Sequence, residues 1–141
     1  MPRVVSYPTD GPHGYAEPLP LVLEATPLQG EFLILGESFS GPLAIQTAAR
    51  QSAGLVGIVL CATFARKPVR LVPAWCGVCV RGWTVRLTSV RTVLRFALGS
   101  EGSFEFTRRI VQALQMVQPA VLAARVRALM SVDVIKELRG C

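Results

Sequence analysis

The sequence predicts an α/β fold in which a short parallel sheet of about three strands, with flanking helices, is followed by a helical region. Two observations predict it. Segments typical of strands and of helices alternate through the first 61 residues, as in parallel βαβ units. From residue 69 to residue 138, apolar residues recur mostly at helical spacing without a clear strand pattern. We therefore expect an α/β core over residues 1–65 and a helical region over residues 66–141.

The chain is expected to begin with a strand at residues 4–7, a β-rich stretch that ends at Pro8. A helix is expected over residues 15–26. Its two prolines, Pro18 and Pro20, fall early in it, where a missing backbone N–H matters least.

The next two strands are expected at residues 32–35 and 55–61. Both runs are apolar without alternation, which is typical of strands buried on both faces of a parallel sheet. Cys61, inside the second run, is expected as a small buried apolar side chain. A helix over residues 42–50 connects the two strands, and Gly54 ends the connection.

Helical spacing continues beyond the third strand. Residues 86–98 are expected as one helix. Pro119 is expected to open another, with one apolar face formed by Leu122, Val126 and Met130. Ser131 or Asp133 is expected to cap a last short helix that ends at Gly140.

Composition restricts the classes of protein to which this chain can belong. With 141 residues, 51% hydrophobic and 17% charged, the chain is long and apolar enough to form a core. The net charge of +6 comes mainly from arginines after residue 65, but no nucleic-acid motif accompanies them, so we expect a solvated basic face. No apolar run is long enough to span a bilayer, and no signal peptide is apparent.

The cysteines are Cys61, Cys76, Cys79 and Cys141. No second pair completes a zinc site near Cys76 and Cys79, and no histidine cluster or phosphate-binding loop is present, so we expect neither a metal nor a cofactor. This cysteine usage favours a reducing, cytoplasmic location.

Two further sequence stretches suggest alternative functions. Trp75-Cys76-Gly77-Val78-Cys79 resembles the WCGxC motif of thioredoxin-like proteins, although the strands that such a protein requires do not follow it. A membrane-surface module is a second alternative, because basic and apolar side chains interleave between residues 81 and 96: Arg81, Arg86, Arg91 and Arg95 beside Trp83, Leu87, Leu94 and Phe96. We expect both stretches to pack as part of a helical layer instead.

The stretch ILGESFSGPLAI, residues 34–45, carries the chemistry. A nucleophilic serine at a tight strand-to-helix turn needs small residues two positions before and after it. Ser38 has Gly36 before it and Ser40 after it, and Gly41 gives room where the helix approaches the sheet. The backbone N–H of Phe39 is the natural oxyanion donor. The alternative is an ordinary turn with a capping serine.

Longer stretches agree with this interpretation. FLILGESFSGPLAIQTAAR resembles the nucleophile elbow of the α/β-hydrolase fold, with Ser40 at the position that is usually glycine. VVSYPTDGPHGYAEPLPLV and LVGIVLCATFARKP resemble the flanking segments of esterase-like members, and PAVLAARVRALMSVDVIKEL resembles their helical lid. The resemblance implies a partial α/β-hydrolase fold and a serine hydrolase acting on a carboxylic ester or related acyl substrate, with Ser38 as the nucleophile.

The partners of that serine are not found in this chain. The family order is serine, acid, histidine, whereas the single histidine, His13, precedes Ser38 in a turn. Asp133 follows Ser38 but is expected as a helix cap, and the usual His-Gly oxyanion loop is not found. We therefore assign no acid and no base in this chain. We expect only the nucleophile elbow and the helical lid of the hydrolase fold, and a weakly active or inactive enzyme. The alternative is a non-catalytic fragment or an interaction module.

Overall fold

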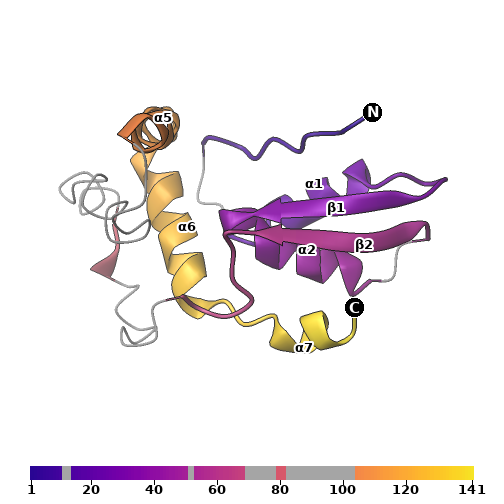
Figure 1. Cartoon of the computed structure of the whole chain (residues 1–141). Helices are drawn as coiled ribbons and strands as arrows, with labels where there is room; N and C mark the ends of the chain where they lie inside the picture. Colours follow the sequence, from indigo (N-terminus) through magenta and orange to yellow (C-terminus); the bar gives the residue numbers. More distant parts are fainter. Residues whose placement is uncertain (11–13, 51–52, 69–78, 82–103) are drawn as a thin grey trace.

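The computed structural model of the chain describes residues 1–10, 14–50, 53–68, 79–81 and 104–141 (Figure 1). Its first half holds the helix α1, the strand β1, the short 3-10 turn η1, the helix α2 and the strand β2: Pro18–Ala25, Phe32–Glu37, Ser38–Ser40, Gly41–Ala48 and Leu55–Cys61. The second half holds the helices α5, α6 and α7: Phe104–Gln115, Pro119–Ser131 and Ile135–Arg139.

The two strands form a parallel pair linked by α2, as the alternation of the sequence predicted. Leu33 lies opposite Gly57, and Leu35 lies opposite Val59, with one irregularity of register at the start of β1. Parallel strands place their carboxyl ends at the same edge of the sheet. The turn after β1 and the segment after β2 therefore lie side by side.

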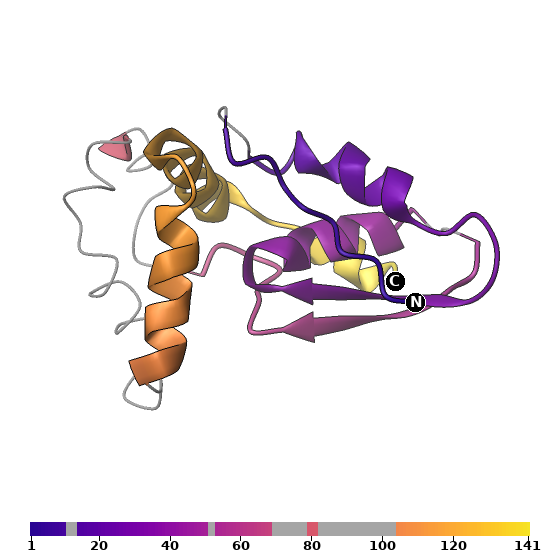
Figure 2. The same ribbon diagram turned by 90° about the horizontal axis from the view of Figure 1, so that it is seen from above.

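The prediction of a strand at residues 4–7 is wrong. These residues run extended beside β1 and in the same direction (Figures 1 and 2), but they form no strand. Their segment is fastened elsewhere: the guanidinium of Arg3 donates a hydrogen bond to the carbonyl of Ala25, at 3.4 Å. A strand is defined by its ladder of backbone hydrogen bonds, and a cavity separates this segment from β1. The sheet of the described residues has two strands rather than three.

Helices α1, α2 and α7 cover the same face of the sheet (Figure 2). Helix α2 lies at the centre of this layer, where Leu43 and Ile45 are fully buried. The chain returns here at its end, because Val132 and Val134 pack on Ile45 in one apolar cluster. The N–H of Val134 donates to the carbonyl of Ala65 at 2.8 Å. Residues from the expected helical region thus complete the core of the α/β part.

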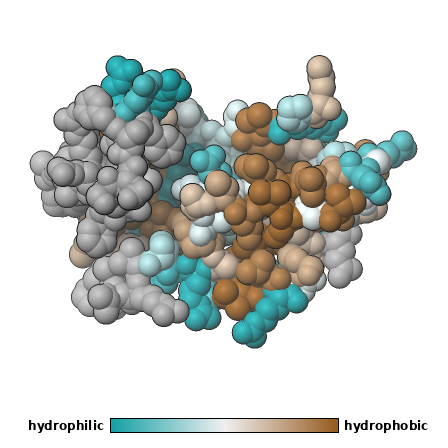
Figure 3. Space-filling view, in the orientation of Figure 1, coloured by the Kyte–Doolittle hydropathy of each residue, from teal (hydrophilic) through white to brown (hydrophobic). Residues whose placement is uncertain are grey.

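The opposite face of the sheet is bare among the described residues, which corrects the expectation of strands buried on both faces. Leu33 and Leu35 are 63% and 65% exposed, and Cys61 is exposed as well. Figure 3 shows the resulting apolar surface over the strands. Apolar runs without alternation predict two covered faces, but here the described helices supply only one layer.

The C-terminal helices differ from the prediction in detail. Helix α6 begins at Pro119 as expected, but its buried residues are Val121, Ala123 and Ala124 instead of Leu122, Val126 and Met130. Small side chains let α6 approach its neighbours on a side that periodicity alone did not favour.

Asp133, and not Ser131, fixes the start of the last helix, a choice that the sequence left open. The carboxylate of Asp133 accepts a hydrogen bond from the N–H of Ile135 at 3.3 Å, so Asp133 fixes the start of α7. Ser131 does not, because its hydroxyl donates back to carbonyls of α6. Asp133 also pairs with Arg66 at 3.1 Å, and both side chains are about half exposed, so this pair contributes little stability.

The segment expected as a helix at residues 86–98, with its arginines, lies outside the described residues, and so do residues 75–78 of the cysteine motif. Within the described part, no helix combines the length and the apolar character needed to cross a bilayer.

Candidate active site

Ser38 follows β1 directly and begins the turn that leads into α2. Its φ is +50°, in the left-handed region that a side chain with a Cβ disfavours by roughly 1–2 kcal/mol. Its side chain is exposed. A strained serine, presented at the carboxyl end of a parallel strand just before a helix, is the local geometry that the sequence predicted.

The small residues around Ser38 are required by close packing. A Cβ on Gly36 would lie 2.8 Å from the Cβ of Ala44 and 2.9 Å from the Cα of Gly41. A Cβ on Gly41 would lie 2.6 Å from the Cβ of Thr63. Such distances are too short for carbon atoms that are not bonded to each other. The turn therefore depends on both glycines, as the spacing of the motif indicated.

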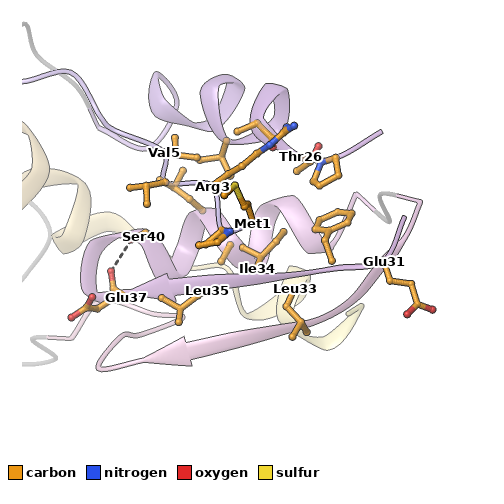
Figure 4. Close-up of a pocket in the computed structure, with 18 of the residues that line it drawn as sticks. Met1, Arg3, Val5, Thr26, Glu31, Leu33, Ile34, Leu35, Glu37 and Ser40 are labelled. Atoms are coloured by element: carbon orange, nitrogen blue, oxygen red, sulfur yellow. Dashed lines mark hydrogen bonds between the residues drawn. The ribbon is translucent and has the colours of Figure 1, made fainter. Parts of the chain in front are cut away.

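The two serines of the motif have different roles. The hydroxyl of Ser40 donates to the carbonyl of Glu37 at 2.8 Å, which closes the turn from within (Figure 4). Ser38 makes no such bond with any described residue. Ser40 thus takes the structural role of a turn serine, and the hydroxyl of Ser38 remains available.

A threonine that the sequence analysis missed holds Ser38 in place. The hydroxyl of Thr63 donates to the carbonyl of Ser38 at 2.5 Å. Thr63 follows β2, and the neighbouring Ala62 has a φ of +44°, so the chain is sharply turned at both strand ends. The signal that could have found Thr63 is its position, because the residues after neighbouring parallel strands meet at one edge.

Phe39 contributes its backbone and its ring. Its N–H belongs to the first turn after the strand, a position where backbone N–H groups lack an acceptor within the helix. Its ring stacks on that of Tyr15, with centroids 4.4 Å apart, and meets the edge of Tyr7 at 6.3 Å. These contacts hold the ring of Phe39 against both tyrosines.

A cation from α6 lies against the same cluster. The guanidinium of Arg125 lies 5.5 Å from the centre of the Phe39 ring and 6.0 Å from that of Tyr7. It also donates to the carbonyl of Pro8, at 3.0 Å. Arg125 thus joins α6 to the N-terminal segment, 117 positions away along the chain, and to Phe39, and no local pattern reveals these contacts.

Burial sets the protonation of this cluster. It raises the pKa of Tyr7, and a side-chain hydrogen bond with Ser40 and the charge of Arg125 oppose that rise. Burial also raises the pKa of Tyr15, and repulsion from Tyr7 adds to the rise. The pKa of Arg125 is lowered by burial and raised by Tyr7, and an arginine remains a cation in proteins. At neutral pH both phenols keep their protons, so neither is a base for Ser38.

Among the described residues, none of the other candidates is brought to Ser38. Asp133 is engaged with Arg66 between α6 and α7, and His13 lies outside the described residues. Cys61, Cys79 and Cys141 are free and exposed. In the ranges that the structure describes, no three side chains of the metal-binding types come together.

A cavity of about 760 Å³ opens between the N-terminal segment, the first two helices and β1 (Figure 4). It follows β1 along its length and reaches Glu37 and Ser40 at the elbow. This volume lies within the range of about 300–1,000 Å³ typical of ligand sites.

Comparisons with protein-family models, with curated proteins and with solved structures found no significant match.

Proposed function

We propose that this chain carries the nucleophile of a serine hydrolase of the α/β-hydrolase type, and that Ser38 attacks a carboxylic ester or a related acyl substrate. The observation that carries this proposal is the left-handed backbone of Ser38, with its exposed side chain, at the carboxyl end of β1. Strain of this kind persists only where the surroundings impose it, and it concentrates at functional sites. An ordinary capping serine needs no such strain, and Ser40 already closes the turn.

The chemistry follows from these positions. The Oγ of Ser38 bonds to the acyl carbon, and the electron pair of the carbonyl moves onto its oxygen. The N–H of Phe39 donates to that oxyanion, and the start of α2 adds a favourable dipole. The proton of Ser38 must pass to a base and then to the leaving alcohol. No described residue is placed to take it.

The expected rate is therefore low. General-base help is worth about 10²–10⁴-fold, and a missing oxyanion donor costs about 10²–10³-fold. These groups act as a unit, so the two factors are not multiplied. We propose that Ser38 is a nucleophile that reacts slowly in this chain. The exposed free thiols favour work in a reducing compartment such as the cytoplasm.

A fluorophosphonate probe tests the proposal on the purified chain. We expect slow labelling, in which the Oγ of Ser38 bonds to phosphorus and fluoride leaves. Ser38→Ala should abolish it, and Ser131→Ala, an exposed serine on α6, should not. Added imidazole should accelerate labelling by supplying the base. Absence of Ser38 labelling at high probe and imidazole concentration would exclude the nucleophile, and fast labelling without imidazole would show that a base is present.

A non-catalytic binding function is the second candidate. The apolar face of the sheet, which no described element covers, and the cavity beside β1 favour it. The membrane-surface and thiol–disulfide alternatives depend mainly on residues outside the described ranges. They stay alternatives, which liposome co-sedimentation and the pKa of the Cys76 thiol would test.

A further inference from the structure

The cavity beside β1 follows the edge of the strand rather than one of its faces. Five residues of β1 line it, from both faces of the strand: Phe32, Leu33, Ile34, Leu35 and Glu37. No residue of β2 does. The opposite wall is the extended N-terminal segment, including Val5 and Tyr7, and the floor includes Val22 of α1 and Ala44 of α2. The cavity is therefore a slot between two extended segments.

The wall formed by β1 carries hydrogen-bonding groups of the backbone. In the described residues β1 has one neighbour in its sheet, β2, so one edge of β1 is paired and the other faces the slot. Along that free edge, N–H and C=O groups alternate without a partner strand. A ligand that covers this edge removes water from these groups and must replace it with hydrogen-bond partners, which an aliphatic ligand cannot give. A polypeptide strand supplies both donors and acceptors at the right spacing.

We propose that this slot binds an extended polypeptide segment of a partner protein, which adds a strand to the free edge of β1. The β1 strand spans six residues, so a matching segment extends over about 20 Å. Alternate apolar side chains would face the floor at Val22 and Ala44 and the exposed side chains of Leu33 and Leu35. This proposal does not depend on hydrolase activity.

The chemistry of the partner follows from the ends of the slot. The charged side chains of the slot are Glu31 and Glu37, exposed at the two ends of β1, and Arg3, whose guanidinium donates to the carbonyl of Ala25. A segment with lysine or arginine on either side of an apolar core would complement the two glutamates. A second folded copy fits poorly, because its own N-terminal segment runs beside its β1 and would block direct pairing of two edges. The occupant is therefore an extended segment.

The N-terminal segment gains a role from this arrangement. Residues 4–7 have the composition of a strand but no ladder of hydrogen bonds. An inserted strand would lie between them and β1 and could pair with both. Binding should therefore slow amide hydrogen exchange in residues 32–37 and also in residues 4–7.

The probe is a fluorescent synthetic peptide with six alternating valines and threonines between flanking lysines. The control is the same peptide with every core amide N-methylated, which keeps the side chains and removes the donors. We expect the unmodified peptide to bind at least tenfold more tightly by fluorescence anisotropy, and to slow exchange in residues 32–37. Equal affinity of the two peptides, absence of binding, or unchanged exchange would overturn the proposal.

Two variants locate the site. Val5→Asp places a charge in the slot and should weaken binding of the peptide by about tenfold. Leu28→Asp changes an apolar residue that is 94% exposed and lies outside the slot, so it should have no effect. Equal effects of both variants would contradict the site. If the free chain dimerises with protection of residues 32–37, a second copy occupies the edge, and the assignment to a partner protein is wrong.

Discussion

Replacing Gly36 with alanine is expected to destabilise the fold by about 1–2 kcal/mol and to disturb the turn at Ser38. The new Cβ would lie 2.8 Å from the Cβ of Ala44 and 2.9 Å from the Cα of Gly41. Ala44 is 2% exposed and Gly41 is part of the backbone of α2, so neither atom can turn away. The helix must move off the strand.

The magnitude is a balance of two effects. Overpacking a close-packed site costs about 1–3 kcal/mol. Exchanging glycine for alanine in an extended segment restricts the unfolded chain and returns about 0.4–1 kcal/mol. The first effect is larger, so the free energy of unfolding should fall, and the melting temperature should fall by several degrees.

Gly57→Ala is the matched control, because Gly57 occupies the neighbouring strand. A Cβ there would meet only the end of the Leu33 side chain, at 3.3 Å. That side chain is largely exposed and can move, so this variant should be as stable as the parent or slightly more stable. Urea unfolding followed by circular dichroism measures both variants. If Gly36→Ala proved as stable as Gly57→Ala, the packing argument for the elbow would be refuted.

Two more variants have expected outcomes. Ser38→Gly should raise the free energy of unfolding by about 1 kcal/mol, since glycine tolerates a positive φ, and labelling by the fluorophosphonate should disappear. A loss of stability would contradict the backbone strain at Ser38. Tyr15→Phe should also be stabilising near pH 7, because the buried hydroxyl of Tyr15 has no hydrogen-bond partner in the described residues. Burial raises the pKa of Tyr15 and Tyr7 in the folded state above the ordinary value of 10.0. The contribution of these two phenols to the free energy of unfolding is therefore fully present below pH 10 and is lost as the pH rises further. Urea unfolding across this range should show a flatter decline for Tyr15→Phe, and an unchanged decline would count against burial of this phenol.

The central part of the fold could be predicted because its signals are local. The two strands, the connecting helix and the elbow lie within about thirty residues, where apolar runs, glycines and prolines restrict the backbone directly. Gly36, Ser38, Phe39, Ser40 and Gly41 are neighbours in the chain, so their spacing already described the turn. The structure confirmed the parallel pairing of the strands and the tight geometry of Ser38.

The sequence by itself determined which segments are strands and helices in this central part and which serine the turn presents. Tertiary structure decided that residues 4–7 lie apart from the sheet, that no described element covers one face of the strands, and that α6 buries its small residues. It also decided that Thr63 and Arg125 reach the elbow. The physical reason is that hydrogen-bond ladders, burial and cation–ring contacts depend on partners far along the chain. Residue order restricts each segment locally, but only packing decides which segments meet.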